Sequence, residues 1–191
     1  MEQILELDHE LFLFLNNLGS PAWDAFWNFI TNKWSSIPLY AVLLYLIYRS
    51  FGLKGMAVTL VLVAGLISIT DQLANVFKAG FERARPCRQE GVMEYARFVA
   101  VRCGKYGYFS AHAASSAALT MFLGFAMKTN YPKLLYFLMV WALMVAYSRI
   151  YVGVHYPLDI FTGFLIGGGF GFLFYKLHAF ILEKYFNHSG A

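Results

Sequence analysis

Five long apolar stretches constrain the fold of this 191-residue chain more than any other feature. A helix needs about 20 apolar residues to span the hydrocarbon core of a bilayer, whereas a spanning strand alternates in polarity with a period of two. None of the five stretches alternates in this way. They cover residues 34–48, 55–77, 108–127, 134–152 and 156–182. We therefore predict an all-α integral membrane protein, a bundle of about five transmembrane helices.

The charge content agrees with this prediction. Only 14% of the residues are charged, whereas a soluble domain carries about 25%. The first and fourth stretches have shorter uncharged cores, so we expect them to be tilted or extended by their polar ends. The length fits a single domain over residues 1–191.

The first 33 residues are less apolar and show helical amphipathicity instead. Apolar residues recur at helical spacing in two groups, Leu5, Leu11, Phe12 and Leu15, then Trp23, Trp27 and Ile30. A Gly-Ser-Pro break at residues 19–21 separates the groups. We predict that residues 1–33 form amphipathic helices lying at the membrane interface, where tryptophan is enriched. A sixth spanning helix is the alternative.

Positive charge is concentrated between the second and third stretches. Residues 78–107 hold seven basic and three acidic residues, a net +4 that equals the formal charge of the whole chain. No basic soluble domain surrounds this segment. We therefore expect it to meet an anionic headgroup at the membrane surface, and we expect no nucleic-acid partner.

Short connectors between the other stretches set the expected orientation. These connectors carry Arg49, Lys54, Lys128 and Lys133, and the tail carries Lys176 and Lys184. These residues would share one side of the membrane, which the positive-inside rule assigns to the cytoplasm. Residues 78–107 are then predicted to form an outward-facing loop.

Three clusters of polar residues interrupt the apolar pattern. Lys78 is followed after six residues by Arg85 and a proline, and the second cluster is Phe-Ser-Ala-His at residues 109–112. In the third, Arg149 precedes His155 by six residues and Asp159 by ten. In a serial up-and-down bundle, the ends of even spans and the starts of odd spans lie on one face. The three clusters are therefore predicted to meet.

Each residue type suits the binding and transfer of a phosphoryl group. Lys78, Arg85 and Arg149 are cations, and arginine offers paired donors that match phosphate oxygens. Ser110 and the amide of Ala111 would start a helix, whose first N–H groups attract anions. His155 and Asp159 would face the same way in a helix that begins near Pro157, so that the carboxylate orients the imidazole. His112 is placed to protonate a leaving group.

The combined pattern resembles the signature of the type-2 phosphatidic acid phosphatase family, and the remaining helices fit its membrane lipid phosphatase branch. The resemblance covers about 80 residues, from Lys78 to Asp159. It implies that Lys78, Arg85, Ser110, Ala111 and Arg149 bind phosphate. His155 would attack phosphorus to give a phosphohistidine, Asp159 would orient His155, and His112 would protonate the leaving group. The family uses no metal or other cofactor for phosphatase activity.

The second cluster departs from the family's usual Pro-Ser-Gly-His, because this chain has Phe109 and Ala111. Ala111 keeps its backbone amide, so the phosphate-binding turn is preserved if φ at Ala111 is negative. A positive φ would be costly for alanine.

Several residues outside the signature have both a functional and a structural interpretation. Asp71 and Asn75 share a helical face with Lys78, so they either support Lys78 or form interhelical hydrogen bonds. The other basic residues of the loop, Arg83, Arg88, Arg97, Arg102 and Lys105, are interpreted mainly as solvated charges. His9, His178 and His188 are interpreted as surface or interfacial residues. Gly163, Gly167 and Gly171 form a stripe that predicts close helix packing within the chain, more readily than a dimer contact.

Cys87 and Cys103 are the only cysteines, and both fall in the basic segment. An outward-facing loop permits a disulfide. We expect this bond to fix Arg85 relative to Ser110 and His112, and two unrelated thiols are the alternative.

Among substrates, the resemblance to the family and the compact chain favour undecaprenyl diphosphate. We expect the protein in a bacterial cytoplasmic (inner) membrane, with the site facing the periplasm or cell exterior. Phosphatidylglycerophosphate, phosphatidic acid and the 1-phosphate of lipid A remain open. The expected partners are the lipid phosphate and the bilayer, and the sequence does not indicate an oligomeric state. A lipid transporter or flippase is the non-enzyme alternative, and a vanadate-dependent peroxidase is a third.

Overall fold

The computed structural model describes residues 2–186, which fold almost entirely into helices. Their order is α1 (Glu2–Asn17), α2 (Pro21–Thr31), η1 (Lys33–Ser36), α3 (Ile37–Phe81), η2 (Pro86–Arg88), α4 (Ala111–Ala126), α5 (Leu134–Tyr151) and α6 (Pro157–Phe186). Within the described residues, the only β pairing is an isolated bridge between Ala84 and Tyr106, which closes the base of the long loop between α3 and α4.

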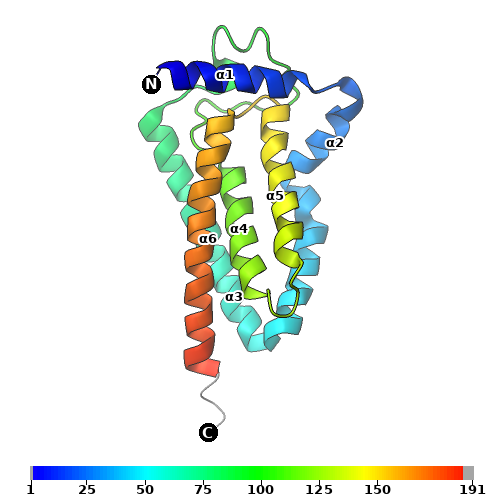
Figure 1. The fold of residues 1–191 in the computed structure, drawn as a ribbon, viewed down its shortest axis with the longest axis vertical. Helices are drawn as coiled ribbons and strands as arrows, with labels where there is room; N and C mark the ends of the chain where they lie inside the picture. Colours follow the sequence, from blue (N-terminus) through cyan, green and yellow to red (C-terminus); the bar gives the residue numbers. More distant parts are fainter. Residues whose placement is uncertain (1, 187–191) are drawn as a thin grey trace.

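Helix α3 consists of two arms that meet at Gly52, where φ is 66° and ψ is −174°. Such a backbone conformation is strained for residues with a Cβ atom but not for glycine. Figure 1 shows the chain turning sharply here, so that residues 37–51 descend and residues 53–81 return. The arms correspond to the first two predicted stretches.

The two arms, α4, α5 and α6 form the bundle. Helices α3, α5 and α6 are long and apolar enough to cross a membrane, and α4 is a shorter apolar helix. With two arms in α3, the described residues provide five apolar helical segments. The predicted all-α membrane bundle is thereby confirmed.

Helix α4 is the most enclosed of these helices and packs closely against α6. A Cβ atom on Gly163, Gly167 or Gly171 would lie 2.7, 2.0 or 2.3 Å from a backbone oxygen of α4 or of its preceding residue. Only glycine permits this approach, because every other side chain would clash with the α4 backbone. The glycine stripe therefore packs within the chain, as predicted.

Helix α1 lies across the end of the bundle where α5 ends and α6 begins (Figure 1). Phe12 is fully buried against Val92, Ile150 and Tyr156. The side chain of Asn16 donates to the carbonyls of Ile150 and Tyr151, each at 2.9 Å. Neither α1 nor α2 belongs to the described helices that have the length and hydropathy of a membrane span. Their position at the interface stays a prediction.

One histidine lies elsewhere than predicted. His178 is buried inside the bundle, where its Nε2 lies 2.9 Å from the hydroxyl of Thr59 and its ring contacts Phe51 and Phe122. The interpretation as a surface or interfacial residue was wrong, because the face of α6 that carries His178 packs against α3. His9 is half-buried and stacks on Tyr156, and His188 lies outside the described residues.

The glycine stripe makes a direct prediction for stability. Gly167→Ala should lower the unfolding free energy by about 1–3 kcal/mol or more, because its Cβ atom would overlap the α4 backbone. Gly169→Ala is the matched control, since nothing lies within 4 Å of its Cβ position. Thermal unfolding of the two purified variants in detergent measures the difference. Equal melting temperatures would contradict the proposed contact.

Candidate active site

The three polar clusters converge at the end of the bundle that α1 covers. Lys78 lies in the last turn of the second arm of α3, and Arg149 lies in the last turn of α5. His112 lies in the first turn of α4, and His155 directly precedes α6. Helix α6 begins at Pro157, so Asp159 falls in its first turn as expected.

These clusters line one cavity of about 610 Å³ that runs from the polar end into the apolar bundle. Its polar end is formed by Lys78, Arg85, His112, Arg149 and His155, together with Asp71, Asn75 and Ala111. The apolar walls come from both arms of α3, from α4 and from α5, and include Leu43, Ile47, Leu60, Val63, Ile67, Leu119, Leu123, Trp141 and Val145. The cavity thus combines a cationic end with an apolar body.

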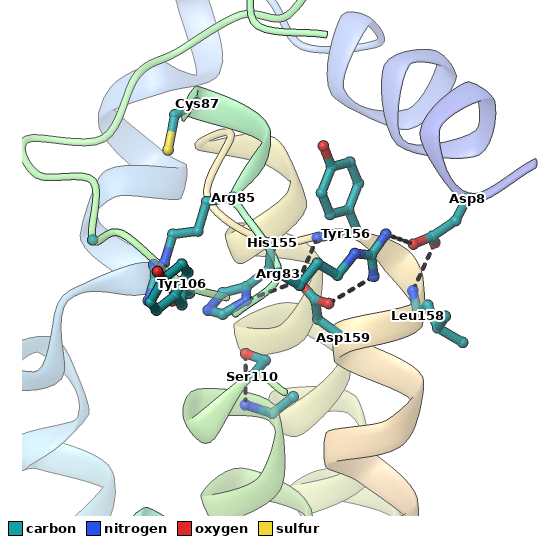
Figure 2. A network of polar contacts seen from close by, with 12 residues as sticks. Asp8, Arg83, Arg85, Cys87, Tyr106, Ser110, His155, Tyr156, Leu158 and Asp159 are labelled. Atoms are coloured by element: carbon teal, nitrogen blue, oxygen red, sulfur yellow. Dashed lines mark hydrogen bonds and ion pairs between the residues drawn. The ribbon is translucent and has the colours of Figure 1, made fainter. Parts of the chain in front are cut away.

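His155 and Asp159 form a buried pair. Nδ1 of His155 lies 3.3 Å from Oδ2 of Asp159, which also accepts the backbone N–H of Tyr156 at 3.0 Å (Figure 2). Burial lowers the pKa of His155 well below its usual value, and the nearby cations Arg85 and Arg149 lower it further. The imidazole is therefore neutral near pH 7 and keeps a lone pair.

The two arginines are held in different ways. Nε of Arg85 donates to the carbonyl of Tyr106 at 2.9 Å, across the isolated bridge. Arg149 donates from one terminal nitrogen to the hydroxyl of Thr31, at the end of α2. Its Nε is buried and has no hydrogen-bond partner among the residues that the structure describes. That free donor suits an anionic ligand in the cavity.

The start of α4 only partly matches the expected phosphate-binding turn. Ser110 is fully buried, and its hydroxyl accepts the N–H of Ala113 at 3.5 Å as the N-cap. It is not among the residues lining the cavity, whereas Ala111 and His112 are. Among the described residues, Glu82 is the only non-glycine residue with a positive φ. Ala111 therefore has the negative φ that the turn requires.

Gly107 is a site residue that sequence reasoning missed. A Cβ atom there would lie 3.1 Å from Cγ of Arg85 and 3.2 Å from Oδ2 of Asp159. Any side chain at residue 107 would therefore press on both groups. No pattern in the sequence distinguished this glycine from the other glycines of the loop.

Arg83 and Arg97 are not the solvated charges that the sequence suggested. Arg83 is only 15% exposed and pairs with Asp159 at 2.9 Å and with Asp8 at 2.5 Å. Arg97 pairs with Asp24 of α2 at 2.9 Å. Both interpretations were wrong because the acidic partners lie more than 70 residues away in the chain. Arg88, Arg102 and Lys105 are exposed, as predicted.

The loop between α3 and α4 is cross-linked near the site. Cys87 and Cys103 form a disulfide with Cα atoms 6.5 Å apart. Cys87 directly follows Arg85-Pro86, and Cys103 precedes the residues that contact Arg85. Within the described residues, no group of three or more His, Cys, Asp or Glu side chains is gathered as a metal site requires.

Proteins with a similar sequence are lipid phosphatases. The lipid A 4'-phosphatase of Bacteroides thetaiotaomicron is 35% identical over 178 residues, which are 92% of this chain and 78% of that protein. The lipid A 4'-phosphatase of Porphyromonas gingivalis is 31% identical and covers 99% of this chain and 80% of its own. An undecaprenyl-diphosphatase of Sulfolobus acidocaldarius is 42% identical over only 36% of this chain and 32% of its own. The preference for undecaprenyl diphosphate as substrate is therefore not supported.

Solved structures share the fold. LpxE of Aquifex aeolicus superposes with a TM-score of 0.67 at 25% identity, over 87% of this chain and 93% of its own. A transmembrane PAP2-type phosphatidylglycerolphosphate phosphatase of Bacillus subtilis superposes with a TM-score of 0.70 over 97% of this chain and 89% of its own. Its identity of 18% supports the fold alone.

The sequence of residues 53–182 matches the PAP2 superfamily, and this range contains all three polar clusters. The membrane bundle and the cationic cavity are what a phosphatase needs to act on a lipid in the bilayer. The chain therefore belongs to the PAP2 superfamily and is a membrane-embedded lipid phosphatase, a hydrolase of phosphate monoesters.

Proposed function

We propose that this protein removes a phosphate from lipid A, most specifically the 4'-phosphate, at the outer face of a bacterial cytoplasmic membrane. The observation that carries this proposal is the 35% identity to a lipid A 4'-phosphatase over 92% of the chain. The alignment extends well beyond the three clusters, over the helices that would contact the rest of the lipid.

The cavity supports an amphipathic substrate. Its cationic end would bind the phosphate, while the apolar walls between the arms of α3 would accommodate hydrocarbon. A soluble phosphate ester would leave those walls unfilled. Burying an acyl chain there contributes roughly 0.8 kcal/mol for each methylene group removed from water.

His155 would act as the nucleophile. With Nδ1 donating to Asp159, Nε2 presents its lone pair to phosphorus, and a new N–P bond forms as the ester O–P bond breaks. Protonated His112 would give its proton to the departing oxygen and become neutral. Water would then attack the phosphohistidine and pass a proton to neutral His112. This step breaks the N–P bond, releases phosphate, and restores neutral His155 and protonated His112.

The cations would stabilise the charge that builds on the phosphoryl oxygens. Lys78, Arg85 and Arg149 line the same end of the cavity as His155, and the helix that begins at Ala111 adds its first amides. Asp71 and Asn75 line the cavity beside Lys78, which supports a role in orienting its ammonium group. Ser110 would contribute through its N-cap on α4, where its hydroxyl accepts the N–H of Ala113.

The outward orientation rests on two features. The Gly52 turn, the connector between α4 and α5 and the end of α6 lie together at the end opposite α1 (Figure 1), and they carry the basic connector residues. The disulfide lies in the loop at the active-site end, and such bonds persist in the periplasm or outside the cell.

A lipid panel tests the substrate. Purified protein in detergent micelles should release phosphate from lipid A that carries phosphates on both sugars, and mass spectrometry should find the product retaining only the 1-phosphate. Undecaprenyl diphosphate, phosphatidylglycerophosphate and phosphatidic acid are the comparison substrates. A higher kcat/KM for any of these lipids would overturn the lipid A proposal. Removal of the 1-phosphate in place of the 4'-phosphate would overturn the proposed position of cleavage.

Substrates with different leaving groups should distinguish the roles of His155 and His112. His155→Ala should abolish turnover and the phospho-enzyme, because no nucleophile remains. His112→Ala should slow the hydrolysis of natural lipids by roughly 10²–10⁴-fold. It should slow the hydrolysis of p-nitrophenyl phosphate far less, because that leaving group needs no proton. Denaturation in alkaline detergent, which preserves the acid-labile N–P bond, followed by counting of protein-bound radiolabelled phosphate, measures the intermediate. Wild-type turnover by His155→Ala would contradict the mechanism.

Thiol labelling tests the sidedness. Protein kept in its native membrane should show no free thiol without reductant and two after reduction, since Cys87 and Cys103 are paired. Closing a loop of about 15 residues stabilises a fold by roughly 3 kcal/mol in the chain-entropy model, so the double Cys→Ala variant should have a lower melting temperature.

Amine labelling of intact cells tests the topology. An impermeant amine reagent should not reach Lys128 or Lys133 from outside. Modification of either lysine from outside would show that the orientation is the reverse of the one proposed.

A further inference from the structure

The carboxylate of Asp159 is held by three donors, only one of which is the imidazole. Oδ2 receives Nδ1 of His155 at 3.3 Å and the N–H of Tyr156 at 3.0 Å. Oδ1 receives a terminal nitrogen of Arg83 at 2.9 Å. A carboxylate can rotate about its Cβ–Cγ bond, so a donor fixed on Oδ1 determines the direction in which Oδ2 points. Arg83 therefore sets the orientation of the acceptor for His155.

Arg83 is itself held by an acidic residue of the amino-terminal helix. Its second terminal nitrogen donates to Oδ2 of Asp8 at 2.5 Å, so the planar guanidinium bridges two carboxylates (Figure 2). The side chain of Asp8 is 5% exposed and that of Asp159 is fully buried. Tyr156 covers Arg83, with the guanidinium carbon 4.2 Å from the ring centroid. These contacts leave Arg83 little freedom to move.

Asp8 also contacts the start of α6 directly. Its Oδ1 accepts the N–H of Leu158 at 2.8 Å, one of the amides that a helix start leaves without a partner. The same carboxylate thus fixes the first turn of α6, which carries Asp159, and the arginine that orients Asp159. Asp8 therefore constrains Asp159 by two routes, one through Arg83 and one through the backbone of α6.

We propose that Arg83 and Asp8 are positioning residues for the reaction, acting on the His155 nucleophile through Asp159. The amino-terminal helix α1, which precedes the residues that match the superfamily, then completes the active site. This inference rests on the proposed role of His155, but it does not depend on which lipid is the substrate.

A contact that only holds α1 on the bundle would have a different effect when it is removed. Its loss would lower stability and the amount of active protein, with turnover per active site unchanged. Loss of a positioning contact lowers kcat, because a misplacement of about 1 Å at the reacting groups costs up to roughly 100-fold. Affinity for phosphate should persist, since Arg83 and Asp8 are not among the residues lining the cavity.

The test compares Arg83→Gln, Arg83→Lys and Asp8→Asn with wild-type protein in detergent, using p-nitrophenyl phosphate. Phospho-enzyme burst amplitude counts the active sites. We expect kcat per site to fall roughly 100-fold for Arg83→Gln and about 10-fold for Asp8→Asn, with the inhibition constant of inorganic phosphate within about twofold of wild type. Arg83→Lys should recover part of the loss, since an ammonium keeps the charge but cannot bridge both carboxylates.

Asp24→Asn is the matched control. Asp24 joins α2 to the same loop through Arg97 at 2.9 Å, but it makes no contact with Asp159, so its loss should leave kcat within about twofold of wild type. Wild-type kcat in both Arg83→Gln and Asp8→Asn would overturn the proposal. So would an equal loss in Asp24→Asn, or a loss of phosphate affinity parallel to that of kcat. If Arg83→Gln does not fold, Asp8→Asn decides alone. If p-nitrophenyl phosphate is hydrolysed but lipid A is not, only the proposed substrate fails.

Discussion

The close approach of α4 to α6 determines where the reacting groups can lie. Gly163, at the active-site end of the glycine stripe, packs against the carbonyl of Ser110, and the N–H of Ser110 donates to the carbonyl of Asp159 at 3.0 Å. The start of α4, with His112, is thereby held beside the start of α6, with Asp159 and the proposed nucleophile His155. In a bilayer this contact cannot rely on the hydrophobic effect, so it depends on van der Waals packing and on hydrogen bonds between backbones.

Three cations, Lys78, Arg85 and Arg149, line the polar end of the cavity beside the carboxylate of Asp71. The cations repel one another in a partly dehydrated space, and among the described residues Nε of Arg149 has no hydrogen-bond partner. The two arginines are held by neutral acceptors, namely the carbonyl of Tyr106 and the hydroxyl of Thr31. Neutral acceptors leave the positive charge available, so that an incoming phosphate meets cations that need no rearrangement.

The amino-terminal helices contribute more than an interfacial anchor. Thr31 of α2 holds Arg149, and Asp8 of α1 holds both Arg83 and the first turn of α6. Both residues precede the range that matches the superfamily. Residues of the candidate site are thus held in this chain by contacts that come from outside the matched range.

The sequence by itself determined the properties that depend on local pattern. Apolar length identified the spans, the spacing of Lys78, Arg85, His112, Arg149, His155 and Asp159 identified the cluster, and a four-residue glycine period identified the packing face of α6. The tertiary structure decided which distant groups meet. Asp8 pairs with Arg83 across 75 residues, and His178 meets Thr59 across 119. Periodicity and spacing report only on neighbours along the chain, whereas the partner of a buried charge depends on how the helices pack.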